Sequence, residues 1–414
     1  MADHRRAFAG APVHYHPYVE PAPGAGKGLL AALAARAAVV VTDQSPAFFY
    51  PRLLAAAAAQ VPCRLEAVDG VGLLPLRAAD GRVFPSAHAF RRHLQRTLPE
   101  HLHAWPAPAP LAALDLPAPV LPSFLPERWP APDPALLAGD PAALARLPID
   151  HRVAPAPLPG GPDAGARALA EFLARRLPRY AEGRNDLDDG AASGLSPYLH
   201  FGHVGAHQIV RALLDRARWS PDRLGRVTGS REGWWGLDPA AEAFLDELIT
   251  WRELGHHLAH HRPASERHES LPEWARQTLA AHAADPRERL YTLADFERAR
   301  THDPLWNAAQ RQLLVEGTIH NYLRMLWGKK ILEWSPTPQD ALAVMIELNN
   351  KYALDGRDPN SYSGIFWVLG RYDRPWGPER PVIGLLRPMS SQNTARKLRT
   401  RGYLARHGDA PPLL

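Results

Sequence analysis

The sequence predicts a two-part protein, an α/β region built on a parallel sheet followed by an all-helical region. Three observations predict this class. β-branched runs alternate with alanine- and leucine-rich stretches before residue 104, prolines are dense from 104 to 162, and helical periodicity dominates from 166 onward. Alternating strands and helices are typical of βαβ units, whose strands run parallel. A length of 414 residues with 46% hydrophobic content suffices for two or three domains.

The first region contains three strand candidates separated by helical stretches. In chain order, they are strand 13–19, helix 29–38, strand 39–43, helix 51–60, strand 63–69 and helix 87–98. A doubly wound sheet should contain more strands than these and begin with one near its N-terminus. Residues 1–103 are therefore predicted to form an incomplete, shortened Rossmann-like domain. The GAGKG segment at 24–28 lacks the spacing of a phosphate-binding loop and is interpreted as a helix-opening turn.

The rest of the chain is predicted to be a connector and a helical domain. Dense prolines and weak periodicity indicate an extended connector over residues 104–164. Residues 165–414 are predicted to form a helical domain large enough to hold a cofactor. Its helices are expected at residues 166–180, 205–217, 240–261, 286–299, 311–334 and 338–352, and no strand is expected there.

Composition excludes several classes of protein. No uncharged apolar run reaches the roughly 18 residues of a membrane span, and the N-terminus lacks the apolar core of a signal peptide. We therefore expect a soluble cytoplasmic protein with no membrane partner, associated with the nucleoid in a prokaryote. The single cysteine, Cys63, excludes an internal disulfide framework and a cysteine-rich metal site. Any redox chemistry would have to come from a cofactor.

Positive charge is concentrated at the end of the chain. From Ser361 onward there are nine lysines and arginines against three acidic residues. Such a local excess suits contacts with phosphates, although charge alone is equally consistent with a solvated face.

The segment HHLAHH places two histidine pairs at helical spacing. His256 precedes His260 by four residues, and His257 precedes His261 by four, a spacing that can hold zinc when a carboxylate such as Glu253 helps. No third ligand is evident. We therefore predict no metal site and interpret the cluster as a solvated or DNA-proximal face.

Three of the twelve tryptophans lie in or near one predicted helix. Trp327 and Trp334 are seven residues apart and therefore share a helix face, and Trp306 lies just before the helix. Pattern alone allows two interpretations, a packed core or an electron-transfer chain. The choice between them requires a redox cofactor nearby.

Four segments carry recognisable motifs. SGLSPYLHFG at 193–202 places small and hydroxyl residues before a helix, where free N–H groups can meet a pyrophosphate. RYAEGRND lies at 179–186, FLDELITWREL lies at 244–254, and the run 316–389 contains LRMLWGKKILEW, LDGRDPN and RPVIG. Together they resemble the photolyase and cryptochrome family, and the last run is similar to class II cyclobutane pyrimidine dimer photolyases specifically.

The resemblance implies FAD as cofactor and leaves a second antenna chromophore undetermined. It implies that Trp327 is the tryptophan nearest the flavin, that Trp306 is the middle one and that Trp334 lies at the surface. It also implies an ion pair between Arg324 and Asp355 beside the cofactor. The implied cofactor-binding residues are Tyr180, Ser193, Gly194, Leu195, Ser196, Arg252, Asn321, Arg324, Asp355, Gly356, Arg357 and Asp358.

For the reaction, the resemblance implies light-dependent repair of pyrimidine dimers in DNA by a monomeric lyase. Reduced FAD would pass an electron to a dimer flipped out of the duplex. The implied catalytic residues, which face the dimer or the flavin, are Glu247, Trp251, Met325, Asn349 and Trp367. On the DNA side the implied residues are Arg374 and Arg387, and Arg252 is expected to turn toward the flavin or the DNA backbone.

Departures from the family pattern keep alternatives open. Asn321 stands where class II enzymes commonly have a small residue, and His203 stands where glutamine is common. A flavin photoreceptor without repair activity is one alternative. A second is repair of the (6-4) lesion, for which His203 or His320 could supply the required histidine. A third is an inactive DNA-binding or structural relic.

Overall fold

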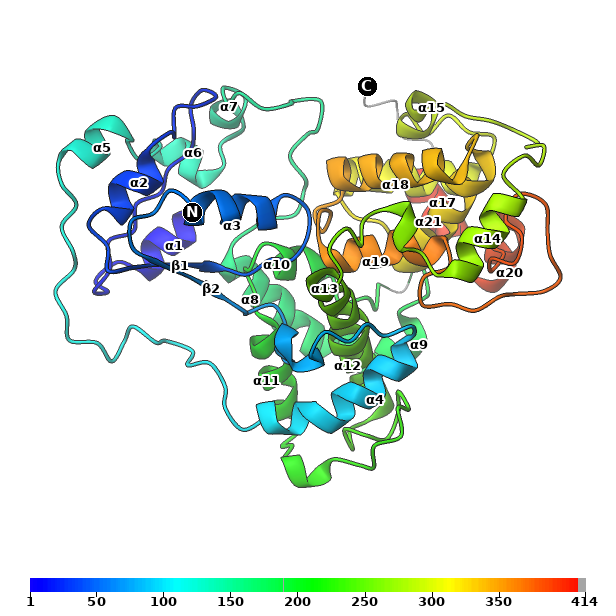
Figure 1. Cartoon of the computed structure of the whole chain (residues 1–414), viewed down its shortest axis with the longest axis horizontal. Coiled ribbons are helices and arrows are strands. Elements are labelled where there is room, and N and C mark those ends of the chain that lie inside the picture. Colours follow the sequence, from blue (N-terminus) through cyan, green and yellow to red (C-terminus); the bar gives the residue numbers. More distant parts are fainter. Residues whose placement is uncertain (189, 409–414) are drawn as a thin grey trace.

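The computed structural model describes residues 1–188 and 190–408. Figure 1 shows the N-terminal elements on the left, a set of helices below, and the C-terminal helices on the right. Helix α13 (Arg252–His261) lies near the centre of this arrangement. No helix within these residues combines the length and the apolarity needed to cross a lipid bilayer.

The N-terminal elements include one parallel pair of strands. Strands β1 (Val39–Asp43) and β2 (Arg64–Val68) pair in parallel, with Val39 opposite Arg64 and Asp43 opposite Val68. Helix α3 (Tyr50–Ala58) connects them, so the predicted βαβ unit is confirmed. Short helices α1 (Ala2–Ala7) and α2 (Leu29–Ala34) precede this unit.

The strand predicted at residues 13–19 is wrong. The backbone from His14 to Glu20 is irregular and pairs with no other strand. Two side-chain features explain the difference. Pro17 has no N–H to offer a sheet, and the ring of His16 makes its hydrogen bond to the carbonyl of Trp129 at 2.9 Å.

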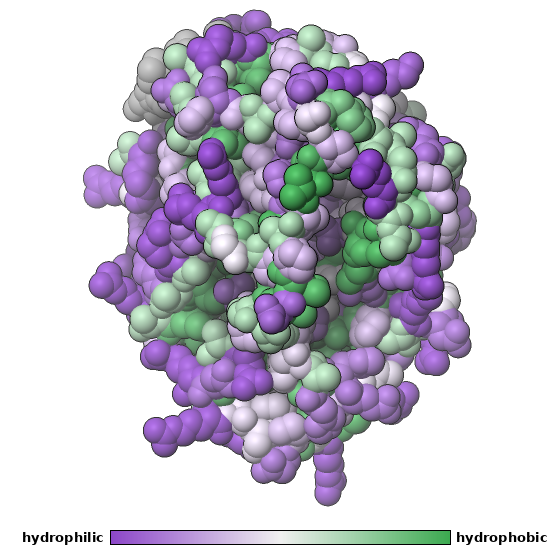
Figure 2. Space-filling model, turned by 90° about the vertical axis from the view of Figure 1, so that its left-hand side faces the viewer, coloured by the Kyte–Doolittle hydropathy of each residue, from purple (hydrophilic) through white to green (hydrophobic). Residues whose placement is uncertain are grey.

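The two-stranded sheet is thinly covered. Val41 and Leu53 keep 58% and 55% of their surface exposed, and α3 contains no buried residue. Figure 2 shows green hydrophobic residues distributed among polar ones on the face at the left of Figure 1. Most burial in this protein therefore occurs in the helical part, where two hydrophobic clusters form.

The middle part of the connector packs against the N-terminal elements. Short helices α5 (Phe124–Arg128), α6 (Pro134–Ala138) and α7 (Pro141–Leu144) interrupt it. Trp129 is 1% exposed and donates its indole N–H to the carbonyl of Ala25 at 3.1 Å. The predicted domain boundaries at residues 103 and 164 remain predictions.

One hydrophobic cluster joins residues before and after the connector. Helix α4 (Ala87–Thr97) contributes Phe90 and Leu94 to a core that also contains residues 164–254. Its other helices are α8 (Pro162–Glu171), α9 (Tyr180–Gly183), α10 (Ser196–His200), α11 (Ala206–Arg216) and α12 (Pro239–Leu245). The helix predicted at 205–217 is thus confirmed as α11.

The second cluster belongs to the C-terminal helices. These are α14 (Glu273–Ala281), α15 (Leu293–Glu297), α16 (Pro304–Glu316), α17 (Asn321–Trp334), α18 (Pro338–Tyr352), α19 (Pro359–Val368), α20 (Ser391–Lys397) and α21 (Arg401–His407). The helix predicted at 338–352 is confirmed, whereas α14 was not predicted and only α15 forms within 286–299. From residue 190 to residue 408 the structure has no β-strand, and an isolated bridge joins Arg380 to Gly384.

The helix predicted at 311–334 is two helices. Gly317 ends α16 with a φ of 66°, a left-handed conformation that glycine adopts without strain. Its carbonyl then accepts a hydrogen bond from Leu354 N at 2.8 Å, which draws the turn after α18 toward the gap between the helices. The first of the two helices, α16, begins at Pro304, before the predicted start at residue 311, so Trp306 lies inside it.

Two predicted helices contain a π-helical turn. Residues Phe172–Arg176 follow α8, and residues Asp246–Trp251 join α12 to α13. Such turns are common at functional sites because they change the direction in which side chains project. Gly255 lets α13 approach α19, since a Cβ there would lie 2.9 Å from the carbonyl oxygen of Pro359.

Candidate functional site

Asp355 joins three segments that are far apart in the sequence. Its carboxylate pairs with Arg324 at 3.0 Å and accepts a hydrogen bond from the hydroxyl of Ser196 at 2.8 Å. The predicted ion pair is therefore confirmed, and its side chains are only 17% and 16% exposed. This contact brings the turn at 193–196 and the start of α17 to the turn after α18.

The turn that carries Asp355 depends on close backbone packing. A Cβ on Gly356 would lie 2.6 Å from the carbonyl oxygen of Asn349, so only glycine fits without a shift. Arg357 has a φ of 62°, and its guanidinium donates to the carbonyl of Asn350 at 2.9 Å. The turn is thus fixed against the end of α18.

Asp358 lies in a buried polar cluster on the other side of this turn. It caps α19 by accepting a hydrogen bond from Asn360 N at 2.8 Å. The rings of His200 and His256 approach its carboxylate at 3.5 and 3.8 Å. Burial opposes its ionisation, but these histidines and Arg252 outweigh burial and hold the pKa of Asp358 below its usual range.

Helices α17, α18 and α19 bring further predicted residues together. Asn349 is 3% exposed and donates its amide N–H to Ser361 Oγ at 2.6 Å. Met325 lies against Gly364. A Cβ added to Gly364 would be 3.7 Å from the methyl carbon of Met325. Trp367 is half-buried near the end of α19, three residues beyond Gly364. One helix therefore links the surroundings of Asn349, Met325 and Trp367.

Glu247 is held by an arginine from the RYAEGRND segment. Its carboxylate forms an ion pair with Arg184, whose guanidinium lies 5.6 Å from the centre of the Tyr180 ring. Tyr180 packs edge-on against Phe172 and Phe244. Burial raises the pKa of Glu247, and the charge of Arg184 opposes that rise.

Arg184 was therefore missed as a site residue, although it stands in a motif that the sequence singles out. Arg184 and Glu247 are 63 positions apart in the sequence, so no local sequence pattern indicates their contact. In the remaining predicted cofactor segment, Leu195 is buried, Gly194 has a φ of 66°, and Ser193 Oγ accepts from Leu195 N at 3.4 Å. Asn321 is exposed at the first position of α17.

Arg252 contacts the loop before α4, where its guanidinium donates to the carbonyl of Val71. Its expected direction toward the flavin or the DNA backbone stays a prediction. The adjacent Glu253 accepts hydrogen bonds from Leu73 N at 2.7 Å and Leu74 N at 3.1 Å. The loop before α4 supplies backbone partners that no helix pattern could indicate, and it ties the N-terminal part to α13.

Replacing Glu253 by glutamine should lower stability most at acidic pH. Burial raises the pKa of Glu253 to about 7, above the usual 4.5. The folded protein therefore binds a proton at Glu253 more tightly than the unfolded chain does. The contribution of Glu253 to the free energy of unfolding is largest at acidic pH and declines as pH rises from 4.5 to 7. Glutamine should cost about 1–3 kcal/mol, because one backbone N–H loses its acceptor, and should remove this slope.

Urea denaturation of both proteins at pH 5 and pH 8 would measure the effect. The exposed Glu182 on α9 provides a matched control when replaced by glutamine. Equal pH dependence in the wild-type protein and the Glu253→Gln variant would contradict the assignment.

The first histidine of each pair is buried and the second is half-buried, which corrects the interpretation of HHLAHH as a solvated face. His256 and His257 are 2% and 1% exposed. His261 contacts the carbonyl of Leu76 at 2.7 Å, and His260 contacts Gln44 at 3.3 Å. Neither pair gathers a third ligand, since residues 1–188 and 190–408 contain no histidine, cysteine or carboxylate cluster suited to a metal.

The three tryptophans form a continuous stack in the predicted order. Trp306 lies parallel to Trp327, with ring centres 6.5 Å apart and an angle of 3°, and meets Trp334 edge-on at 6.0 Å. The indole of Trp306 donates to the carbonyl of Trp327 at 3.0 Å, and that of Trp327 donates to Gln310 at 2.8 Å. The rings of Trp306 and Trp327 are therefore fixed in orientation as well as in distance.

Trp334 is not at the surface, contrary to the expectation for the last member. It is only 6% exposed. His302 and Tyr291 cover it with ring-centre distances of 5.0 and 5.6 Å. The sequence did not indicate this cover because both residues come from the segment around α15.

The two predicted DNA-side arginines both lie close to one tryptophan, Trp376. Arg374 and Arg387 approach the Trp376 ring centre at 4.5 and 4.2 Å. Asp373 accepts from Arg387 Nε at 2.9 Å and from the Trp376 indole at 3.1 Å. Arg387 is also 5.4 Å from the Trp367 ring centre, which connects this cluster to α19.

The histidines considered for other lesions occupy restricted positions. His203 Nδ1 accepts a hydrogen bond from the backbone N–H of Gly161 at 3.1 Å. His320 precedes α17, and burial lowers its pKa and favours the neutral ring. Burial also lowers the pKa of His203, so burial disfavours the charged form of both rings.

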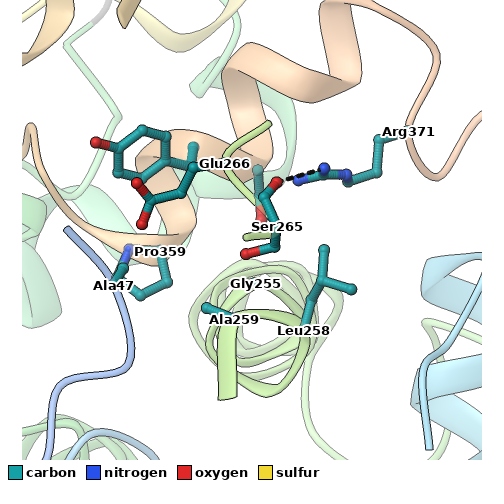
Figure 3. Close-up of a pocket in the computed structure, with 10 residues that line it drawn as sticks. Ala47, Gly255, Leu258, Ala259, Ser265, Glu266, Pro359 and Arg371 are labelled. Carbon is teal, nitrogen blue, oxygen red and sulfur yellow. Dashed lines mark hydrogen bonds between the residues drawn. The ribbon is translucent and has the colours of Figure 1, made fainter. Parts of the chain in front are cut away.

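A separate hollow lies between α13, α19 and the N-terminal part (Figure 3). It is small, and its wall includes Ala47. Arg371 donates to the carbonyl of Ser265 at 2.7 Å, and Glu266 accepts from Phe48 N at 2.8 Å. Since none of the predicted site residues lines it, we regard this hollow as part of the junction between the two regions.

Comparison with known proteins identifies the family. No family model matches the chain. A deoxyribodipyrimidine photo-lyase of Oryza sativa subsp. japonica is 35% identical over 346 residues, covering 82% of this chain and 62% of its own. One from Methanothermobacter thermautotrophicus is 33% identical over 370 residues, covering 89% of this chain and 74% of its own. The chain belongs to the deoxyribodipyrimidine photo-lyase family.

Solved structures support the same fold for this photolyase-family chain. A class III photolyase from Agrobacterium tumefaciens matches with a TM-score of 0.64 at 20% identity, over 90% of this chain and 68% of that one. A cryptochrome from Synechocystis matches with the same TM-score of 0.64 at 15% identity. The photolyase relatives from rice and Arabidopsis thaliana are longer, since this chain spans 62% and 64% of their lengths.

Proposed function

We propose that this chain is a light-dependent DNA photolyase that holds FAD around the Arg324–Asp355 pair. The residues present fit such a cofactor. Among residues 1–188 and 190–408, the buried Arg324 Nε has no hydrogen-bond partner, so it is available to an acceptor on a ligand. Ser196 and the amide of Asn349 add polar groups from two other segments. When bound, reduced FAD would supply the electron that splits a pyrimidine dimer.

The observation that carries the proposal is the arrangement along α17. Arg324, Met325 and Trp327 lie within four consecutive positions, about one helical turn. This turn therefore joins the ion pair proposed to hold the cofactor, a side chain proposed to contact the lesion, and the tryptophan stack. A redox cofactor at Arg324 would favour an electron-transfer chain over a packed core as the role of the tryptophans. The stack would carry an electron toward the cofactor rather than take part in dimer splitting.

The lesion side is assigned to residues around Trp251 and Trp367. Both rings are half-buried and could pack on a flipped base, together with Met325. Glu247 would stabilise charge that develops on a base carbonyl, and its ion pair with Arg184 fixes the position of its carboxyl group. Asn349 would direct its amide to the flavin, and Arg374 and Arg387 would contact the DNA backbone.

The substrate is proposed to be DNA that contains cyclobutane pyrimidine dimers, in keeping with the class II motifs. A blue-light repair assay on a defined thymine-dimer oligonucleotide tests this, with a (6-4) lesion as parallel substrate. Repair of the first and not of the second is expected. A purified chain without flavin absorption bands would contradict the cofactor assignment. The monomeric state and the cytoplasmic location remain predictions.

Replacing Glu247 by alanine should reduce dimer repair roughly a hundredfold, the usual effect of losing one donor that stabilises developing charge. Flavin content should remain unchanged, because the Arg324–Asp355 pair is untouched. The exposed Glu182 of the neighbouring α9 serves as the control when replaced by alanine. Light-dependent loss of dimers and flavin absorbance should be measured together. Unchanged repair in the Glu247→Ala variant would show that another residue performs this role.

A further inference from the structure

Lys329 is a buried lysine between the tryptophan stack and the DNA-side residues. It lies on α17 two positions after Trp327 and is 1% exposed. Its ammonium donates to the carbonyl of Val368 near the end of α19. The neighbouring Gly328 packs closely on Val368 and Met345, so the surroundings are mostly apolar. A lysine ammonium is rarely fully buried, because removing its charge from water is costly unless polar or charged partners compensate.

The charges and rings around Lys329 belong to the proposed lesion side. Its Nζ lies 5.5 Å from the centre of the Trp367 ring, and Arg387 lies 5.4 Å from the same ring centre. Asp373 forms an ion pair with Arg387 at 2.9 Å. Within residues 1–188 and 190–408, no carboxylate oxygen approaches Lys329 closely enough for an ion pair of its own. The Lys329 ammonium therefore interacts electrostatically with Asp373 and Arg387 at longer range.

We propose that Lys329 is a positioning residue of the lesion site. Its ammonium holds the end of α19 and the Trp367 ring, and its charge supports the arrangement of Asp373 and Arg387 that receives damaged DNA. This inference rests on the proposed function and deepens it. It adds a buried charge behind the surface that the lesion would meet.

The burial of Lys329 implies a pH dependence. The charged groups that face it are Asp373 and Arg387 from the segment after α19 and Glu333 from α17. Burial lowers the pKa of Lys329 to about 7; Asp373 and Glu333 oppose the fall, and Arg387 adds to it. Negative charge from bound DNA should raise this pKa. DNA binding would then be accompanied by proton uptake, and affinity should decrease as pH rises through 7.

Binding in the dark tests the proposal without light-driven turnover. The flavin-loaded protein would be titrated into a fluorescent thymine-dimer duplex between pH 6 and pH 9. If bound DNA raises the pKa of Lys329 by about one unit, Kd should rise about tenfold across this window. Lys329→Met should bind about as weakly as the wild-type protein at pH 9, with a flat profile. Lys330→Met provides a matched control, since Lys330 pairs with Glu333 on the same helix.

Two measurements keep the result interpretable. Melting temperature and flavin absorbance show whether Lys329→Met folds, and calorimetry of the wild-type protein in two buffers of different ionisation enthalpy measures proton uptake directly. Absence of proton uptake near pH 7, or the same pH profile in the wild-type protein and Lys329→Met, would overturn the proposal. Equal affinity of the wild-type protein for damaged and undamaged duplexes would instead contradict the proposed function.

Discussion

Replacement of Trp306 by phenylalanine is expected to abolish detectable photoreduction of the oxidised flavin. Trp306 is the middle ring of the stack, 6.5 Å from Trp327 and 6.0 Å from Trp334, so the outer members exchange an electron most directly through it. Phenylalanine fills much of the same space but is far harder to oxidise. Bleaching of the flavin absorption under blue light, with an external reductant present, measures the effect.

The matched control is Trp129→Phe, because Trp129 is equally buried but lies in the connector, far from the stack. Both variants lose an indole hydrogen bond, which costs about 1 kcal/mol. Dimer repair by chemically reduced protein should persist in Trp306→Phe, since the stack is assigned to reloading rather than repair. Photoreduction at the wild-type rate in that variant would refute the stack as the route.

Replacement of Asp355 by alanine should remove most bound flavin. Arg324 would lose its ion-pair partner while remaining largely buried, and Ser196 would lose its acceptor. Breaking one side of such a pair costs about 3 kcal/mol, which corresponds to roughly a hundredfold weaker binding if the cofactor site bears the cost. The ratio of flavin absorbance to protein absorbance in the purified variant measures the loss.

Asp285→Ala controls for the loss of a hydrogen-bonded carboxylate, because Asp285 bonds Val382 N and His282 outside the proposed site. Asp355→Asn separates charge from hydrogen bonding, since asparagine keeps an acceptor for Ser196 but offers Arg324 no charge. An intermediate flavin content is expected. Full flavin content in the Asp355→Ala variant would place the cofactor elsewhere.

Local pattern was sufficient for the regular elements with strong signals. The VVVTD run became β1, and the stretches 205–217 and 338–352 became α11 and α18 with nearly the predicted ends. The errors occur where backbone chemistry competes with pattern. Pro17 interrupts a run of valine, histidine and tyrosine that otherwise has the pattern of a strand. Gly317 divides an apolar helical pattern because it adopts a left-handed conformation.

Within the candidate site, the motifs identified the Arg324–Asp355 pair before the structure placed the two residues together. The tryptophan stack was likewise predicted in its order, because helical spacing and family motif agreed. The assigned roles of these residues remain proposals. The motifs did not indicate which residue each polar side chain would pair with, as the ion pair between Arg184 and Glu247 shows.

The sequence by itself determined the family motifs, the parallel βαβ unit and the predominance of helices, because these depend on neighbouring residues and local periodicity. Only the tertiary structure decided that Arg252 meets Val71, that His256 is buried and that Trp334 is covered. It also revealed Lys329 as a buried charge beside Trp367. The reason is physical, since burial and pairing of a polar group depend on which distant segments pack against it.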